Sequence, residues 1–328
     1  MAEAEDGDLI AAIKTDPILA PYVDALLRLA RPSIRLTVDP EAPRSIGESR
    51  VGGPPAAHVG FSWPTRHVDM PRPSKAWLDS HPYEERRLPE DGVSSFQFIA
   101  QIDLSAIASF DVDGLLPHDG VLLFFYDEAY SADIDPAGPL KPTSWSLRDG
   151  EPEFYQREFG SDPVDQVRVL HVPGDLSLAP HRSGPFAADA LPLVGSAELT
   201  VPSVDAYVIA QDSEPPDRLG GRLVLPPDAW DRLAELRYQH RANARINQML
   251  GWEDNSAHGP SLPPGTTGWD SIPADDRLRE LSDPRLLLQL DPATYERLGI
   301  EFGRTLYFYA RETDLRRGDF SRAWYDSD

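Results

Sequence analysis

The sequence has no cysteine, little positive charge and no long hydrophobic run. The absence of cysteine excludes disulfides, thiolate nucleophiles and cysteine-based zinc or iron–sulfur sites. Lysine and arginine number 31 against 54 acidic residues, a formal charge of -23, which argues against nucleic-acid and anionic-membrane partners because phosphate attraction needs a positive field. The longest apolar run, 121–126, has the length of a strand and not of a membrane-spanning helix.

What is present is the composition of a globular protein, with 41% hydrophobic and 26% charged residues among 328. The acidic start, residues 1–6, lacks the basic and apolar regions of a signal peptide, so we expect a cytoplasmic protein. The preference for arginine over lysine, with abundant Ala, Asp and Pro, is typical of a bacterial genome rich in GC. No cofactor motif is found, and we expect no cofactor.

Proline, at 33 residues, is about twice as frequent as usual, so long helices must be few. The apolar spacing in 7–30, interrupted by Pro17 and Pro21, predicts two short helices. The segment 41–89 is rich in Pro, Gly and Ser and predicts a packed, irregular loop. We expect strands at 34–38, 95–103, 121–126, 166–172 and 206–210, a long helix at 228–250 between Pro226-Pro227 and Gly251, and a short helix at 274–281.

Two segments of the sequence echo each other. The run Phe98 to Asp103 resembles Leu286 to Asp291 in its Gln-apolar-Asp ending, and each run is preceded by a glycine turn and followed by a glycine and an aromatic strand. Two copies of a strand-turn-strand unit would pack as pseudo-symmetric lobes around one core. Chance similarity between apolar strands is the alternative.

The order of these landmarks resembles that of the DUF1963, or YwqG-like, family over about residues 45–325. The resemblance implies an α+β fold built around antiparallel sheet, without an established activity. Asn247-Gln248 stands where the family often has a histidine. The landmarks are Val51-Gly52-Gly53, Trp63-Pro64, Phe98 to Leu104, Leu116-Pro117-x-x-Gly120, Leu122 to Phe125, Met249 to Trp252, Leu286 to Asp291, Tyr307-Phe308-Tyr309, Asp314-Leu315, Asp319-Phe320-Ser321 and Trp324.

The predicted fold class is therefore α+β, with antiparallel β-sheets in two pseudo-symmetric lobes and short peripheral helices. An N-terminal helical segment, 1–40, precedes a single YwqG-like domain, 41–328. Lobe one spans about 41–210 and lobe two about 220–328.

Basic residues supply one candidate site. Arg237, Arg241 and Arg245 recur at intervals of four, so a helix would place them on one face beside His240. They either form ion pairs with acids of the chain or bind a carboxylate or phosphate.

Polar and aromatic side chains supply a second candidate site. Gln101 and Gln289 either bond each other's backbone at the seam between the lobes or line a cleft that holds a peptide-like ligand. Trp63 and Trp252, each after a glycine turn, form the walls of that cleft or belong to the core.

Acidic residues after the first aromatic strand supply a third candidate site. Asp127 and Glu128 either bind a cation or a cationic ligand or belong to a solvated loop. His58, His67 and His81 lie in the wrapping segment, but scattered solvated histidines are favoured over a metal site, and none is predicted.

The hypothesis favoured by these features is an intracellular binding protein, in one form an immunity-type protein. It recognises a protein or peptide partner through the cleft between the lobes and the acidic surface. The alternative is a cysteine-independent enzyme that acts on a small molecule or peptide with carboxylate and histidine groups, with or without a metal. The catalytic residues and the oligomeric state are not predicted.

Overall fold

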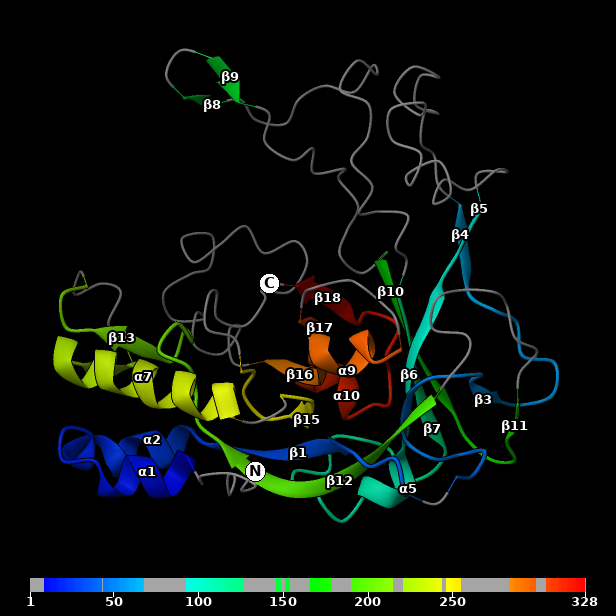
Figure 1. The fold of residues 1–328 in the computed structure, drawn as a ribbon, viewed down its shortest axis with the longest axis horizontal. Helices are drawn as coiled ribbons and strands as arrows, with labels where there is room; N and C mark the ends of the chain where they lie inside the picture. Colours follow the sequence, from blue (N-terminus) through cyan, green and yellow to red (C-terminus); the bar gives the residue numbers. More distant parts are fainter. Residues whose placement is uncertain are drawn as a thin grey trace.

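The computed structural model describes residues 9–42, 44–67, 93–126, 146–148, 151–153, 166–178, 190–214, 221–243, 246–254, 283–298 and 305–327. Its main element is one sheet of ten strands, in which all neighbours are antiparallel (Figure 1). In spatial order the strands are β10 (Val167–Val172), β7 (Val121–Tyr126), β6 (Gln97–Asp103), β2 (Arg50–Gly52), β12 (Ala190–Thr200), β1 (Arg31–Val38), β15 (Gln248–Leu250), β16 (Pro284–Leu290), β17 (Leu306–Arg311) and β18 (Trp324–Ser327).

The sheet curls into a nearly closed barrel, because its two ends approach each other. The rings of Tyr126 on β7 and Tyr325 on β18 lie 4.7 Å apart between centroids, and those of Phe124 and Phe308 lie 5.2 Å apart. Both halves of the sheet contribute to one buried cluster on the inner face. The antiparallel α+β class is thus confirmed, and the strands form one continuous sheet and not a separate sheet in each lobe.

A β-bulge changes which residues of β6 face the core. The sequence predicts that Phe98, Ala100 and Ile102 share one face, but the register shifts between Phe98 and Ala100. Phe98 therefore packs on the outer face, whereas Ala100 and Ile102 join the inner core. The extra residue of the bulge moves the following side chains to the other face of the strand. A prediction that assumes strict alternation of side chains therefore assigns Phe98 to the wrong face.

The long helix expected at 228–250 is shorter than predicted. It begins at Pro227, the favoured first position for proline, and ends at Asn243, and residues 248–250 form β15 between β1 and β16. The pairing of residues 248–250 with β1 and β16 therefore overrides the apolar spacing that predicted a helix up to residue 250. The helices are α1 (Leu9–Thr15), the 3₁₀ turn η1 (Ala20–Tyr22), α2 (Val23–Leu29), α5 (Leu104–Ile107), α7 (Pro227–Asn243), α9 (Pro292–Glu296) and α10 (Glu312–Leu315).

The N-terminal helices lie beside α7 at one end of the sheet (Figure 1). Their apolar residues form a second buried cluster with α7 and the segment 201–209. The two short N-terminal helices are as predicted, separated by the 3₁₀ turn. β1 follows them directly and lies in the middle of the sheet, so the sheet crosses the boundary expected at residue 40.

Four small two-stranded sheets complete the described structure. They are β3 (Ala56–Ala57) with β11 (Ser177–Leu178), β4 (Thr65–His67) with β5 (Val93–Ser95), β8 (Ser146–Arg148) with β9 (Glu151–Glu153), and the parallel pair β13 (Ile209–Gln211) with β14 (Leu223–Leu225). The helix expected at 274–281 lies outside the described residues. None of the helices in the described ranges has the length and apolar character needed to cross a membrane.

Candidate functional site

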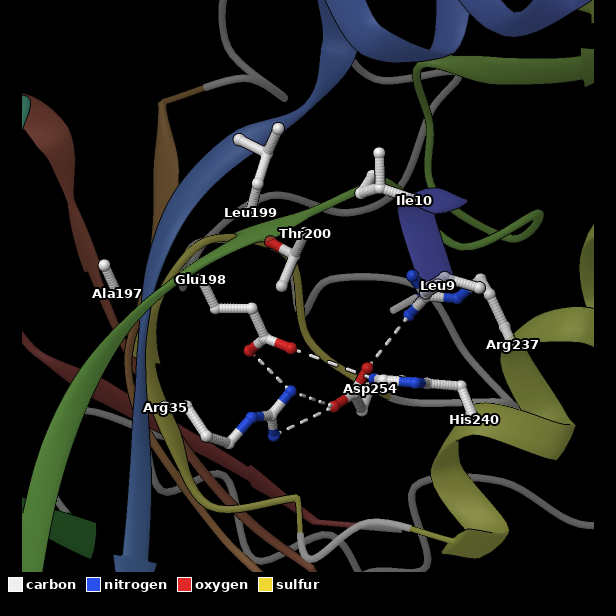
Figure 2. Close-up of a pocket in the computed structure, with 10 residues that line it drawn as sticks. All are labelled: Leu9, Ile10, Arg35, Ala197, Glu198, Leu199, Thr200, Arg237, His240 and Asp254. Carbon is white, nitrogen blue, oxygen red and sulfur yellow. Dashed lines mark hydrogen bonds and ion pairs between the residues drawn. The ribbon is translucent and has the colours of Figure 1, made fainter. Parts of the chain in front are cut away.

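A pocket of about 440 Å³ lies on the outer face of the central β1–β12 pair, where α1 and α7 approach the sheet (Figure 2). Period two along β1 places Ile34 and Leu36 in the inner core and turns Arg35 outward. The pocket is lined by Leu9, Ile10, Arg35, Ala197, Glu198, Leu199, Thr200, Arg237, His240 and Asp254.

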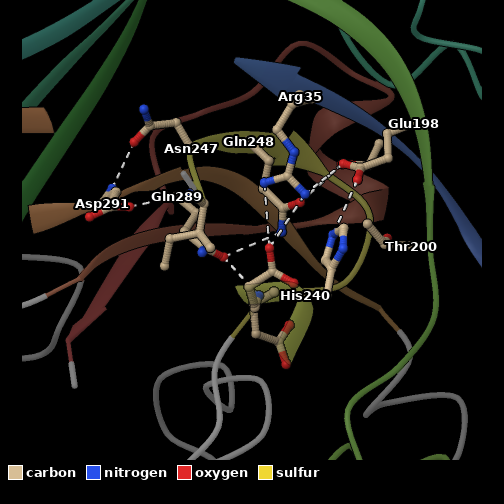
Figure 3. A network of polar contacts seen from close by, with 12 residues as sticks. Arg35, Glu198, Thr200, His240, Asn247, Gln248, Gln289 and Asp291 are labelled. Carbon is tan, nitrogen blue, oxygen red and sulfur yellow. Dashed lines mark hydrogen bonds and ion pairs between the residues drawn. The ribbon is translucent and has the colours of Figure 1, made fainter. Parts of the chain in front are cut away.

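Five of these side chains form a series of ion pairs that alternates in sign, which we call the charge chain (Figures 2 and 3). The distances along it are 3.8, 2.7, 3.4 and 3.5 Å between nitrogen and oxygen atoms. In order, its members are His240, Glu198, Arg35, Asp254 and Arg237.

The central pair of the charge chain is held in its ionised form. Burial alone raises the pKa of Glu198, but the imidazole of His240 and the guanidinium of Arg35 outweigh it, so this pKa lies below its ordinary value. Burial lowers the pKa of Arg35, but Asp254 and Glu198 raise it more. Glu198 and Arg35 are therefore both charged at neutral pH.

Arg237, the first residue of the predicted arginine row, serves mainly to hold the backbone. Its guanidinium donates to the carbonyl oxygens of Val201 and Glu253, the latter at 2.7 Å, and lies 3.5 Å from Asp254. Of the two readings of the row, ion pairing within the chain therefore describes Arg237. The side chain of Arg241, and Arg245 as a whole, lie outside the described residues.

Glu253 is a buried acid directly behind the pocket. Its side chain is 2% exposed, and one carboxyl oxygen, Oε1, has no hydrogen-bond partner. Burial raises the pKa of Glu253 to about 7, although its own backbone N–H and the charges of Arg237 and Arg31 act in the opposite direction. At neutral pH this carboxyl is therefore partly protonated.

The paired glutamines are buried and hold loops. Gln101 accepts from the backbone N–H of Ala56 at 2.7 Å and donates to the carbonyls of Ile46 and Glu48. Gln289 accepts from the backbone N–H of Asp254 at 2.9 Å (Figure 3 shows its surroundings). The prediction that they bond each other's backbone is wrong, and neither lines a cleft, because both are fully buried.

Neither candidate tryptophan lines the pocket, because Trp252 is buried in the core and Trp63 packs, half-buried, against the aromatic cluster of the outer face. Trp63 donates to the carbonyl of Phe96 at 2.6 Å and packs edge-on against Phe125. Trp252 is 2% exposed, donates to the carbonyl of Leu29 at 2.7 Å and lies under the guanidinium of Arg31. The acidic candidates Asp127 and Glu128 lie outside the described residues.

Most of the pocket was not predicted, because its members come from distant segments. Arg35 interrupts the apolar strand 34–38, and Asp254 follows the second glycine turn, which were the two visible signals. Glu198 lies in a strand that the sequence does not predict, and His240 was noted only as a neighbour of the arginine row. Among the described residues, no group of three or more histidines and acids is arranged to hold a metal ion.

Comparison with known proteins identifies the family. The model of a domain of unknown function, DUF1963, matches residues 49–328, which is most of the chain. A search of curated proteins found no matching relative. The chain belongs to the DUF1963 family.

Proposed function

We propose that this member of the family is a binding protein that recognises a segment of a protein or peptide partner in the pocket. The charge chain carries the proposal, because it brings two cations, two carboxylates and a histidine to a partly open cavity of ligand size. The acidic surface would attract a basic partner. The cytoplasmic location and the bacterial origin stay predictions from the sequence.

We further propose that the pocket lies where two copies of one β unit join. The strand order supports this: outward from the central pair, β12 is followed by β2, β6, β7 and β10, and β1 by β15, β16, β17 and β18. In this arrangement the first long strand of each copy pairs with a short strand of the other copy, β1 with β15 and β12 with β2. If the two copies are aligned at the residues of β1 and β12 that pair with the glycine turns, Thr37 of β1 corresponds to Val194 of β12. These two residues pair directly with each other in the sheet.

The buried glutamines support the same duplication. Each lies on the outer face, one residue beyond a β-bulge. Each accepts a hydrogen bond from a backbone N–H in the loop after a glycine turn, Gln101 from Ala56 and Gln289 from Asp254. These surroundings are alike, as a pair of copies requires.

The aspartates that end the two strands add an independent parallel. Asp103 and Asp291 each cap a short helix by accepting from its first backbone N–H groups. Their own backbone N–H groups donate to side chains just before the glycine turns, to Ser49 at 2.9 Å and to Asn247 at 2.7 Å. Chance similarity of apolar strands does not account for matched polar bonds.

The pocket is where the two proposed copies differ. Ala56 corresponds to Asp254, because each donates its backbone N–H to the buried glutamine of its copy. Pro192 corresponds to Arg35, because each pairs with the same position of its short strand, Pro192 with β2 and Arg35 with β15. Two members of the charge chain thus occupy positions that are uncharged in the other copy. A charged site confined to one copy favours a function in recognition over a role in the common framework.

Binding is favoured over catalysis because the charged groups of the pocket are already paired. Glu198 is ionised and flanked by Arg35, so it is a weak general acid. The hydroxyl of Thr200 accepts from the backbone N–H of Trp252 at 2.8 Å and donates to the carbonyl of Arg31, so it is not poised as a nucleophile. Turnover of a bound peptide by the wild type, but not by His240→Gln, would favour the enzyme alternative.

The test is affinity capture with a variant that removes a charge of the pocket. The side chain of Glu198 is 25% exposed, more than the other charged side chains of the pocket, so Glu198→Gln removes its most accessible charge and keeps the shape of the side chain. The control is Glu312→Gln, which removes an acid paired with Arg285 outside the pocket. We expect the wild type and the control to retain the same purified polypeptide and Glu198→Gln to lose it; equal retention by all three would contradict the proposal.

A further inference from the structure

The accessible charge in the pocket is a carboxylate oxygen. The side chain of Glu198 is 25% exposed, whereas those of Arg35 and His240 are each 13% exposed. One oxygen of Glu198, Oε2, is buried beside Arg35. The other, Oε1, lies 3.8 Å from the His240 ring, beyond hydrogen-bond distance, so it can accept from a ligand.

A second carboxylate of the pocket has acceptor capacity left. Oδ1 of Asp254 lies 3.5 Å from Arg237, whose two terminal nitrogens already donate to backbone carbonyls. Charge-assisted bonds between nitrogen and oxygen are usually about 2.7–2.9 Å long, and a carboxylate accepts up to about four. A donor of higher charge density would therefore bind Asp254 more closely than Arg237 does.

The positive groups of the pocket are less exposed than Glu198 and are held by other groups of the chain. Arg35 is held between Glu198 and Asp254, and Arg237 is held by Val201 and Glu253. The net charge of -23 also disfavours the approach of an anion. These observations favour a cation over a carboxylate or phosphate.

The rest of the lining is apolar on one side. Leu9 and Ile10 of α1 contribute to the wall and are each 8% exposed, whereas the side chain of Leu199 points to the opposite face of β12 from Glu198 (Figure 2). A ligand that binds here can therefore place an aliphatic part against α1 next to its charge. A cavity of about 440 Å³ is within the range of small-ligand sites.

From these features we infer that the pocket binds a primary ammonium group on an aliphatic chain, with Glu198 as its exposed acceptor, Asp254 as a second acceptor, and Leu9 and Ile10 against the chain. In a polypeptide this chemistry has two sources, an N-terminal aliphatic residue and a lysine side chain. The inference rests on the proposed function only in taking the ligand to be part of a polypeptide.

Three model peptides test the inference by titration calorimetry against the full-length protein. Leu-Ala-Ala-Ala-amide presents a free N-terminus, acetyl-Ala-Lys-Ala-Ala-amide presents only a lysine, and acetyl-Leu-Ala-Ala-Ala-amide has no ammonium group. We expect at least one of the first two to bind and the third to bind at least tenfold more weakly. Equal affinity of all three, or no binding by any, would overturn the inference.

The dependence on pH separates the two sources. An α-amino group loses its proton near pH 8 and a lysine near pH 10.4. Binding of an N-terminus should therefore decline between about pH 7 and pH 9, whereas binding of lysine should persist through that range. A lysine peptide whose affinity falls in parallel with that of the N-terminal peptide between pH 7 and pH 9 would contradict this assignment.

Variants identify the acceptors. Glu198→Gln and Asp254→Asn should each weaken binding about tenfold or more, the loss expected when one charge-assisted hydrogen bond is removed. Glu312→Gln is the matched control, because Glu312 is 23% exposed and paired with an arginine outside the pocket, and it should leave affinity unchanged.

The outcomes distinguish this inference from the proposed function. A polypeptide partner that is lost with Glu198→Gln but retained after its amines are acetylated would sustain the pocket as a binding site and refute the ammonium ligand. A partner that every pocket variant retains would refute the proposed function itself.

Discussion

Replacement of Glu253 by glutamine tests the electrostatics behind the pocket. Glutamine keeps the shape of the side chain but cannot ionise. The folded-state pKa of Glu253 is about 7, above its ordinary value of 4.5, because the side chain is buried. The folded state therefore binds more protons than the unfolded state between these values, and the stability contribution of Glu253 is lost as pH rises.

The size of the effect follows from the difference in pKa. Each unit corresponds to about 1.4 kcal/mol, so wild-type stability should fall by about 2 to 3 kcal/mol between pH 5 and 8.5 through this group alone. Other acids also titrate, so the informative quantity is the difference between wild type and Glu253→Gln. In that difference the variant gains about 2 to 3 kcal/mol relative to wild type over the same range.

Urea unfolding followed by tryptophan fluorescence, at half-unit steps of pH, measures this difference. Glu41→Gln is the control, because it removes one acid in the same way from an exposed position. Parallel curves for wild type and Glu253→Gln would refute the reasoning. That result would mean that Glu253 has an ordinary pKa and thus is paired or hydrated in solution.

Three further substitutions test other parts of the structure. Gln101→Leu should cost about 2 kcal/mol or more in urea unfolding, because it leaves buried backbone groups without partners. Gly251→Ala should lower the melting temperature by several degrees, since its backbone has φ +73° and an added Cβ would lie 2.5 Å from Oγ1 of Thr200, whereas Gly114→Ala, with φ +60° and open space, should cost less. Arg35→Met should cost about 3 kcal/mol at pH 7 and less once the pH falls below the lowered pKa of Glu198, where this partner gains a proton; equal losses at neutral and acid pH would contradict the ion-pair account.

The sequence predicts the elements whose signals are local. The apolar run at 121–126 and the proline-bounded start of α7 are both recovered within a residue. β15 is missed because three residues do not display a period, and only its pairing with β1 and β16 defines it as a strand. The end of α7 is misplaced for the same reason, since the apolar residues of β15 extend the helical spacing.

The pocket is harder to predict than the sheet, because proximity in it is entirely tertiary. Arg35, Glu198 and Asp254 are separated by most of the chain and meet only because β1 pairs with β12 and β15. Each is unremarkable in its own segment. Gln101 and Gln289 were singled out as candidate site residues, but each holds a loop, since a buried amide must be satisfied by whatever backbone lies nearest.

The proposed duplication explains how a charged pocket could form without loss of the framework. The glutamine of each copy needs only a backbone N–H from the loop after the glycine turn, supplied by Ala56 in one copy and by Asp254 in the other. The side chain at this position is therefore not constrained by the hydrogen bond that fixes its backbone. A carboxylate there is free to pair with Arg35 and to face a ligand, while the common framework keeps it in place.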